Sequence, residues 1–294
     1  MRPLLAAALV ALVLAHPAAA LPFGVNLLRN AGAETGEASP NGETLVPIPR
    51  WTGTLTVNRY GGSNGPPNFW VFPPVSEAQR INGGAQFFAG AAGGTLSQPI
   101  DMAWAAAAID LGVVTATLSG WLGGYLSQRD PGTVEAEFFD NGSTQVGRAV
   151  IGPIAPAERG NDSRFVHKTT TVAVPRRARR IRVVLTATRQ EGGYADTYFD
   201  NLSLILHAPK PEPPKLKIVQ RCIDHASVVY VSSRAQLMQV SFWINGQQRG
   251  TDRAKPFFTG FLLTRPVKLK VVATALVLGQ PTDSTRVLRL RACA

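Results

Sequence analysis

The sequence predicts an all-β protein built from two modules. Three observations point to this fold class: short segments of alternating polar and apolar residues recur, Gly and Pro are frequent (28 and 22 of 294 residues), and long helical periodicities are absent. A chain of this length also exceeds the roughly 100–200 residues of a single domain. We therefore expect strands and turns arranged around two separate hydrophobic cores.

The first twenty residues, MRPLLAAALVALVLAHPAAA, have the pattern of a secretory signal peptide. Arg2 supplies the positive charge, residues 4–14 the apolar stretch, and residues 18–20 a cleavage site of small residues. The alternative is a membrane anchor, but the apolar run is shorter than the roughly 20 residues that span a bilayer. The sequence therefore predicts an exported protein, secreted or held at the cell surface, without a transmembrane segment.

Residues 21–206 are predicted to form the first module, which is a series of short strands. The segment TVEAEFFDNGSTQVGRAVI (residues 133–151) alternates on both sides of a DNGS turn, as expected of a β-hairpin. Alternation continues in ATLSGWLGGYLS (116–127), FVHKTTTVAVP (165–175) and RIRVVLTATRQ (180–190), with no helix expected between them. This pattern is typical of a β-sandwich or jelly roll.

The segment HAPKPEPPK, residues 207–215, is predicted to be the linker, because its four prolines favour a stiff, extended chain. Charge differs sharply on its two sides. Residues 21–208 contain 15 basic residues (Lys and Arg) and 15 acidic residues (Asp and Glu), so their net charge is zero. Residues 209–294 contain 14 basic and 4 acidic residues, a net charge of +10. Such a surface favours polyanions, namely nucleic acid, an acidic cell-wall polymer or a membrane surface, and export makes nucleic acid the weaker choice. The alternative is a solvated basic surface without a specific partner.

Residues 216–294, the second module, contain about six or seven expected strands, with Asn245-Gly246 as a type I′ hairpin turn. This number of strands fits a small immunoglobulin-like β-sandwich. Cys222 and Cys293 are the only cysteines. In an exported protein an isolated pair predicts a disulfide rather than a zinc site, here between the first and last strands.

Catalytic motifs are weak in this chain. Residues 61–65, GGSNG, match the G-x-S-x-G nucleophile elbow, but the following Pro66-Pro67 is incompatible with the helix that this elbow needs. Glu135 and Glu137 alternate on one face of a predicted strand and are expected to face solvent. No pair of carboxylates stands out, so we expect no catalytic residues and no enzymatic activity.

The segment ADTYFDNLSLIL, residues 195–206, contains two aspartates. If Phe199 begins a strand, alternation places Asp200 on the face of Leu202, Leu204 and Leu206. A carboxylate there is costly unless it is hydrogen-bonded to the backbone or binds a cation, for which extracellular calcium is a natural candidate. Asp196 precedes the strand and is expected in a loop or at the rim.

The first module resembles the galactose-binding-like β-jelly-roll domains, a group that includes many bacterial carbohydrate-binding modules. The segments that carry the resemblance are NLLRNAGAETG (26–36) with Trp51, NGGAQFFAGAAGGTLSQPIDM (82–102), IDLGVVTATLSGWLGGY (109–125) and GGYADTYFDNLSLIL (192–206). The resemblance implies two antiparallel sheets and a structural calcium ion where the first and last strands meet. Glu34 and Asp200 match the metal-binding positions, and backbone carbonyls would complete the shell.

The resemblance also implies a non-catalytic protein that recognises a glycan or cell-envelope polysaccharide through exposed aromatic rings. The predicted ligand-binding residues are Tyr60, Trp70, Tyr125 and Tyr194, and Phe69, Phe72 and Trp104 are further candidates. The alternative is that these rings seal the ends of the sandwich. Members of this group bind other ligands or none, so the fold does not decide the function.

In the second module, VSFWINGQQRGTDRAKPF (240–257) resembles a hairpin of the small immunoglobulin-like domains in secreted bacterial surface proteins. This resemblance implies a spacer or adhesive role and supplies no catalytic residue. The second hypothesis for the whole chain is therefore a structural or adhesive surface protein that contacts protein partners and has no sugar ligand.

Overall fold

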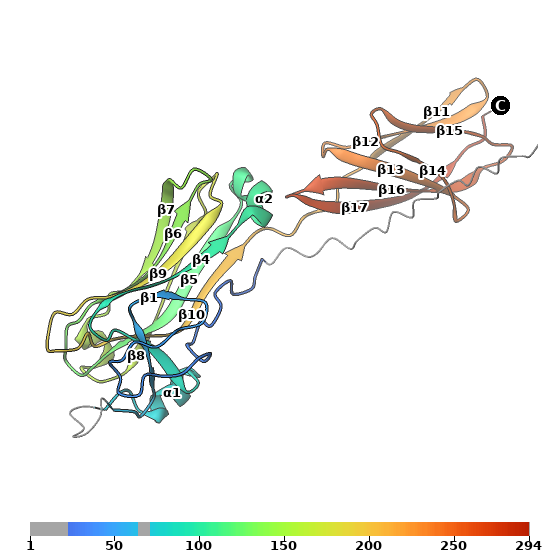
Figure 1. Ribbon diagram of the computed structural model, residues 1–294. Coiled ribbons are helices and arrows are strands. Elements are labelled where there is room, and N and C mark those ends of the chain that lie inside the picture. The colour runs from blue at the N-terminus through green and yellow to red at the C-terminus, as the bar shows by residue number, and fades with distance from the viewer. Residues whose placement is uncertain (1–22, 64–70, 294) are drawn as a thin grey trace, which may run out of the picture. The chain divides into compact units, whose positions relative to one another are not determined.

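The computed structural model describes residues 23–63 and 71–293 (Figure 1). The predicted signal peptide and Trp70 lie outside these residues. The chain divides into two compact units, with the boundary between Lys210 and Pro211, inside the predicted linker. The all-β fold expected from the sequence is confirmed, because strands form antiparallel sheets in both units. Within the described residues, no helix has the length and apolar character needed to cross a bilayer.

The first unit is a sandwich of two five-stranded antiparallel sheets. Its strands are β1 (Thr52–Gly53), β2 (Thr56–Arg59), β3 (Gln86–Ala89), β4 (Gly94–Asp101), β5 (Thr115–Gly124), β6 (Gly132–Phe139), β7 (Gln145–Ile151), β8 (Phe165–Ala173), β9 (Arg180–Ala187) and β10 (Thr197–His207). One sheet has the order β1-β4-β9-β6-β7, and the other has the order β2-β3-β10-β5-β8. We call the second one the β10 sheet. The predicted hairpin is β6–β7, joined by the turn after Phe139.

Alternation along the strands builds the core between the two sheets. Leu118 of β5 and Leu204 of β10 lie opposite each other, and both side chains are fully buried. From the facing sheet, Phe138 and Leu185 are also fully buried. Burial of a large apolar side chain contributes roughly 1.5–3 kcal/mol, so this layer is the main source of stability in the first unit.

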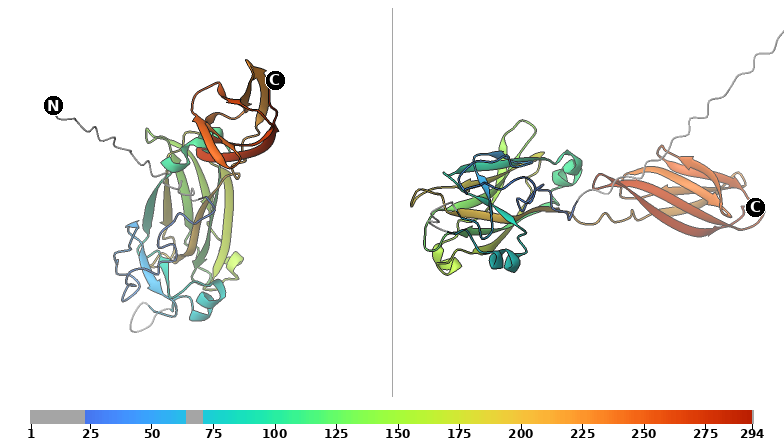
Figure 2. Two further views of the ribbon diagram at one scale, coloured as in Figure 1. Left: turned by 90° about the vertical axis from the view of Figure 1, so that its right-hand side faces the viewer. Right: turned by 60° about the horizontal axis from the view of Figure 1, so that its bottom comes forward.

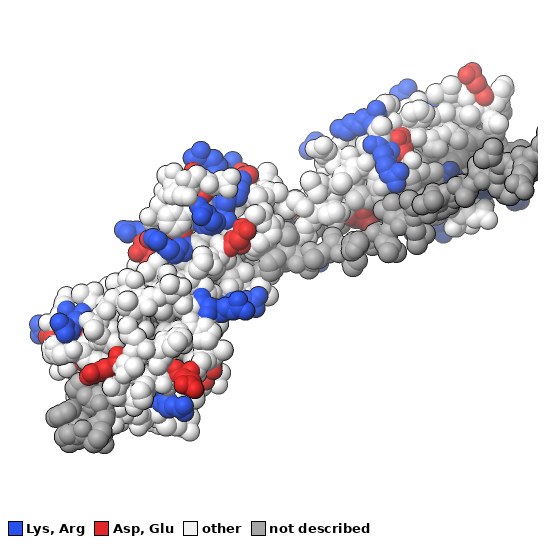
Figure 3. All heavy atoms as spheres, viewed as in Figure 1, with Lys and Arg blue, Asp and Glu red and all other residues white. Residues whose placement is uncertain are grey.

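The outer face of the other sheet is charged. Glu137 pairs with Arg182 at 2.6 Å and Glu135 with Arg148 at 3.3 Å, which confirms the expected solvent-facing position of these two acids. Figure 3 shows acidic and basic side chains of the first unit in adjacent patches. Exposed pairs of this kind contribute about 0–1 kcal/mol each, so this face adds solubility more than stability.

Two short helices depart from the expectation of strands alone. The helix α1 (Val75–Ile81) ends at Asn82, whose φ is 55°, and α2 (Ala106–Leu111) follows the 3-10 turn η1 (Ala103–Ala105). A second 3-10 turn is η2 (Pro156–Arg159). Figure 2 shows α1 and α2 at opposite ends of the first unit. With six or seven residues, each helix is too short to produce a clear helical periodicity in the sequence.

The second unit contains two smaller antiparallel sheets. Its strands are β11 (Lys217–Ile223), β12 (Ala226–Ser232), β13 (Leu237–Ile244), β14 (Gln247–Asp252), β15 (Phe257–Leu262), β16 (Val267–Val277) and β17 (Gln280–Leu290). The orders are β11-β12-β15 and β14-β13-β16-β17. Val229, Phe242, Leu269 and Val271 form the centre of its core. The strand count agrees with the sequence, and the immunoglobulin-like assignment stays a prediction.

Two local features of the second unit match the sequence patterns. Asn245 and Gly246 have φ values of 50° and 85°, the positive values that a type I′ turn requires at both positions. Cys222 in β11 and Cys293 after β17 are joined by a disulfide with a Cα–Cα distance of 5.6 Å. The bridge therefore connects the first strand of this unit to the segment that follows its last strand.

Candidate functional site

A β-bulge in β10 decides which way Asp200 faces. Asp200 pairs with Trp121 of β5, but the register shifts before Ser203, and Asn201 has a φ of 46°. The bulge inserts one extra residue into β10, so side chains before and after it alternate out of step. Leu202 therefore points into the sandwich core, whereas Asp200 lies on the outer side of the β10 sheet. The prediction that Asp200 shares a face with the leucines is therefore wrong, because alternation holds only where no residue is inserted.

Asp200 is nevertheless fully buried, because the C-terminal end of α1, the following Gly83 and the ring of Tyr60 pack over this half of the outer face. Its Oδ2 accepts a hydrogen bond from the Tyr60 hydroxyl at 2.6 Å, and its Oδ1 accepts one from the backbone N–H of Asn201 at 2.6 Å. Burial, and to a smaller extent the negative charge of Glu34, raises the pKa of the Asp200 carboxyl to about 8. No Lys or Arg among the described residues pairs with it.

The structure brings Glu34 to the same place. A Cβ on Gly32 would lie 3.3 Å from Oδ1 of Asp200 and 3.9 Å from Cγ of Glu34, so both acids border this glycine. The Glu34 carboxylate accepts hydrogen bonds from the N–H groups of Ala85 at 3.0 Å and Gln86 at 2.9 Å. Glu34 and Asp200, which lie far apart in the sequence, are therefore neighbours.

The predicted calcium site would have to be built from this acid pair and the backbone around it. The chain turns sharply around it, with positive φ values at Asn30, Ala33 and Asn82. The Asn201 amide donates to the carbonyl groups of Ile81 and Asn82, and its Oδ1 is directed towards Gly32. Calcium binds six to eight oxygens and often uses backbone carbonyls. Since no described cluster of three or more acids, histidines or cysteines forms a metal site here, carbonyl oxygens and Asn201 would have to complete the shell.

Asp196, the other acid of the segment, occupies a separate buried position. Only 4% of its surface is exposed, and its Oδ1 accepts a hydrogen bond from the Tyr198 hydroxyl at 2.8 Å. Burial raises the pKa of Asp196 to about 6, partly opposed by this hydrogen bond and by nearby Arg159. Since β10 begins at Thr197, Asp196 does lie in the loop before the strand, as expected, but that loop is covered and the acid is buried rather than at an exposed rim.

The predicted aromatic platform does not form in the described residues. Tyr60 and Tyr194 are 7% and 3% exposed, because both rings belong to a core cluster beneath α1 with Phe72, Phe87 and Tyr198. The Tyr194 hydroxyl donates to the carbonyl group of Gly42 at 2.9 Å. Tyr125 is half-buried against the same cluster. Tyr60 and Tyr194 therefore follow the alternative considered in the sequence analysis, in which the rings seal an end of the sandwich.

The half of the β10 sheet that α1 leaves uncovered presents hydroxyl groups. Cross-strand pairing puts Ser203 opposite Ser119, and Ser119 opposite Thr169. One step along the strands, Thr117 and Thr171 face each other and share a hydrogen bond of 2.9 Å. These side chains are half-buried or exposed, while the intervening residues of β5 are buried in the core. We call this surface the hydroxyl face.

Trp121 ends the hydroxyl face where α1 begins to cover the sheet. Its indole is half-buried, the guanidinium of Arg80 lies 5.0 Å from the ring centre, and the ring of His167 lies 5.2 Å away. The Arg80 guanidinium donates hydrogen bonds to the Glu77 carboxylate, with an Nε–Oε2 distance of 2.8 Å, and to the carbonyl group of Phe165, at 2.6 Å. An aromatic ring, a planar cation and an imidazole are thus fixed beside a row of hydroxyl groups.

Neither Trp121 nor His167 is among the site residues predicted from the sequence. The signal was present in TATLSGW, since strict alternation puts Trp121 on the polar face with Thr117 and Ser119. Arg80 left no such signal, because its approach to Trp121 depends on where α1 packs. A tryptophan on the polar face of a strand is the feature that would have revealed this site.

No family model matches this chain, and no curated protein matches it. Among solved structures, it is similar to the enzymatically active domain of bacteriophage CBA120 tailspike protein 4, with 15% identity, 62% of this chain and 22% of that one covered, and a TM-score of 0.36. It is also similar to the CBM22-1-CBM22-2 tandem domain of Paenibacillus barcinonensis Xyn10C, with 11% identity, 94% and 87% covered, and a TM-score of 0.35.

The xylan-binding domain CBM22-1 of the same Xyn10C has 11% identity and a TM-score of 0.31, with 60% of this chain and 97% of that domain covered. The chain spans only about a quarter of the length of the phage tailspike, of an arabinofuranosidase and of a xylanase that it matches, between 22% and 27% of each. At this level of similarity the likeness carries no argument about the ligand. The functional inference therefore depends on the residues of this chain.

Proposed function

We propose that the protein is an exported, non-catalytic binding protein that recognises a glycan through the hydroxyl face and Trp121. The observation that carries the proposal is the position of Trp121, half-exposed at the end of a sheet face lined by serines and threonines. The apolar face of a sugar ring stacks on an aromatic ring, and hydroxyl groups both donate and accept hydrogen bonds with those of a sugar. Export rests on the pattern of residues 1–20 alone.

The environment of the acids supports a non-catalytic role. Asp196 and Asp200 are buried, and each carboxylate is bound by a tyrosine hydroxyl, Tyr198 and Tyr60 respectively. A general acid or base must come within about 3 Å of the substrate proton that it transfers. Glu135 and Glu137, on the other sheet, are engaged by arginines. These are the acids that an enzyme hypothesis would use first.

A structural calcium ion at Glu34 and Asp200 is part of the same proposal. The ion would join the loop of residues 30–36 to β10 and neutralise two neighbouring acids that have no basic partner among the described residues. When bound, it would supply charge compensation and rigidity, with no part in a chemical step. The Tyr60 hydroxyl and the backbone N–H of Asn201 hold Asp200 in place from the protein side.

Affinity electrophoresis and isothermal titration calorimetry of the full chain against neutral polysaccharides (xylan, mannan, mixed-linkage β-glucan) test the proposal. Trp121→Ala should weaken binding of the best ligand at least tenfold, about 1.4 kcal/mol. Thr169→Val, which removes an exposed hydroxyl from the same face without touching the core, should also weaken it. The matched control is Trp104→Ala: Trp104, a further candidate from the sequence, lies half-buried in η1, where its ring packs against Phe23, and it is not part of the hydroxyl face.

Equal losses in the Trp121 and Trp104 variants, with unchanged melting temperatures, would contradict this site. If no polysaccharide binds the folded wild-type protein, the glycan proposal fails. In that case the structural or adhesive role with protein partners becomes the better description of the chain.

A further inference from the structure

The basic side chains of the second unit lack acidic partners. Every ion pair among the described residues lies in the first unit. The two carboxylates on the second unit's strands are engaged by neutral donors: Asp252 accepts N–H groups of Ala254 and Phe258, and Asp283 accepts the hydroxyl of Thr274. No ion pair among the described residues therefore offsets the positive charge of this unit.

Two of these cations are placed directly opposite each other. Lys268 of β16 pairs with Arg289 of β17, and both side chains are exposed on the outer face of the four-stranded sheet. The alternate residues Leu269 and Val271 point into the core. Like charges at directly opposite positions destabilise a sheet, so this arrangement is unfavourable unless an anion lies between them.

An aromatic ring lies on the same face. Lys270, two residues beyond Lys268, pairs with Trp243 of β13, and its Nζ lies 5.5 Å from the centre of the indole ring. Trp243 is half-buried, with one part of the ring accessible. The outer face of this sheet thus carries Trp243, Lys270, Lys268 and Arg289 across three neighbouring strands.

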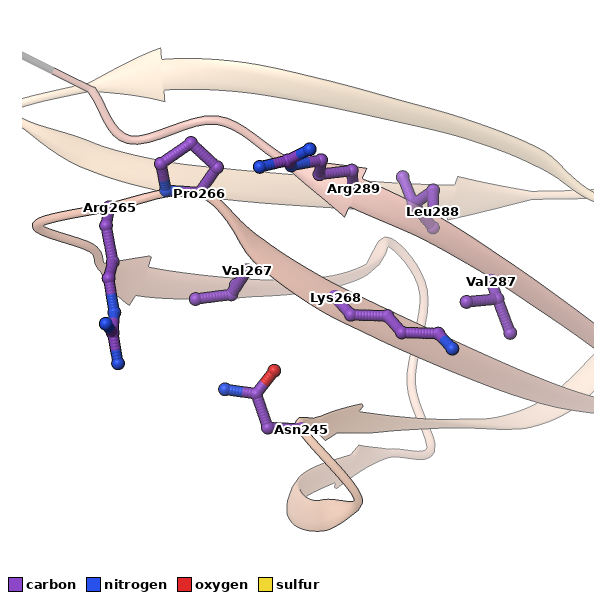
Figure 4. Close-up of a pocket in the computed structure, with 8 residues that line it drawn as sticks. All are labelled: Asn245, Arg265, Pro266, Val267, Lys268, Val287, Leu288 and Arg289. Atoms are coloured by element: carbon purple, nitrogen blue, oxygen red, sulfur yellow. The ribbon is translucent and has the colours of Figure 1, made fainter.

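The cations border an open hollow of about 640 Å³ at one end of the sheet (Figure 4). Arg265, Lys268 and Arg289 line it, together with Asn245 of the hairpin turn. A neighbouring hollow shares Arg265 and Asn245 and adds Arg249. No acidic residue lines either one, so an anion in this region meets only positive and neutral groups.

We infer that this end of the second unit, defined by Trp243, Arg265, Lys268, Lys270 and Arg289, is a binding site for an acidic polysaccharide of the uronate class. Arg265, Lys268 and Arg289 bind the carboxylates of successive sugars, with the planar fork of arginine suited to two-point contacts. Trp243 contacts the apolar face of one sugar ring. The site is separate from the hydroxyl face and does not depend on the proposed function of the first unit.

A nucleic acid or an anionic membrane fits this surface less well. Proteins that bind single strands offer several aromatic rings on which successive bases stack, whereas this patch has one half-buried ring. Peripheral membrane binding commonly uses an amphipathic helix, and residues 211–293 form no helix in the structure. An acidic glycan needs the combination that is present, a row of cations beside one ring.

Titration calorimetry of the full chain with an oligogalacturonate at low ionic strength tests the inference. The uronate should bind, its affinity should fall as salt is raised, and a neutral galactose oligomer of equal length should not compete. Lys268→Gln combined with Arg289→Gln should weaken uronate binding at least tenfold, and Trp243→Phe should weaken it less. Trp121→Ala should leave it unchanged, which separates this site from the hydroxyl face.

The matched control is Lys217→Gln combined with Arg234→Gln. Both residues line a different hollow beside β11, and their loss changes the net charge by the same amount. Uronate affinity should change less than twofold in this variant. An equal loss in both double variants would overturn the site in favour of a general field effect. Binding of single-stranded DNA or of phosphatidylserine vesicles, with no binding of uronate, would also overturn it.

Discussion

The Tyr60 hydroxyl and the Asp200 carboxylate are joined by a buried hydrogen bond of 2.6 Å that links the residue directly after β2 to β10. A Cβ at Gly83 would collide with both partners, so only glycine fits above them. The bond lies beside Glu34 and fixes one of the two acids of the proposed calcium site.

Calcium should stabilise the first unit. The expected gain is RT ln(1 + [Ca]/Kd), about 2.7 kcal/mol at one hundred times Kd, measured as a rise in the melting temperature of that unit. Asp200→Asn and Glu34→Gln should abolish most of the rise, because each removes a proposed ligand. Asp196→Asn, which changes a buried acid bound to Tyr198, should retain it. A melting curve that neither calcium nor a chelator moves would rule out the ion.

Tyr60→Phe should destabilise the first unit by about 1–3 kcal/mol, because Oδ2 of the buried Asp200 loses its donor. Urea unfolding measures the change. Tyr125→Phe is the matched control, since it removes a hydroxyl that makes no hydrogen bond to the described residues, and should change stability by less than 0.5 kcal/mol. Similar effects of the two substitutions would show that the Tyr60–Asp200 bond adds no stability.

Asp196 should make the stability of the first unit depend on pH. Its pKa is about 6 in the folded protein and about 3.9 when unfolded, so between these values the folded state binds more protons. The contribution of Asp196 to the free energy of unfolding is fully present below pH 4 and is lost as the pH rises through 6. The total loss is about 3 kcal/mol. Asp196→Asn should remove this decline. Parallel stability curves for the wild type and the variant from pH 4 to pH 7 would contradict the assignment.

The disulfide should stabilise only the second unit. Cys222 and Cys293 are 71 residues apart, and a loop of this length contributes about 4 kcal/mol by limiting the unfolded chain. Reduction, or Cys222→Ser combined with Cys293→Ser, should lower the melting temperature of the second unit. The transition of the first unit serves as the internal control. If reductant leaves both transitions in place, the bridge is not a major source of stability.

The sequence by itself determined the features that depend on local pattern. Alternation revealed the strands, the prolines of residues 207–215 marked the boundary, and Asn245-Gly246 marked a hairpin. These succeed because side-chain direction in a strand and the φ preferences of Pro, Gly and Asn are set by neighbours in the chain. The resemblance of two segments to a known family also pointed to Glu34 and Asp200 as metal-binding candidates. The fold places these two acids beside each other at Gly32.

Tertiary structure alone decided which face each side chain occupies and which rings are accessible. The extra residue at the bulge by Asn201 places Asp200 on the outer side rather than on the leucine face. Simple alternation along the sequence cannot show such an insertion. Packing of α1 over half of the β10 sheet buried Tyr60 and left Trp121 at the edge of the open half. Burial depends on contacts between segments far apart in the chain, so only the assembled structure shows which part of the β10 sheet is open for the proposed binding surface.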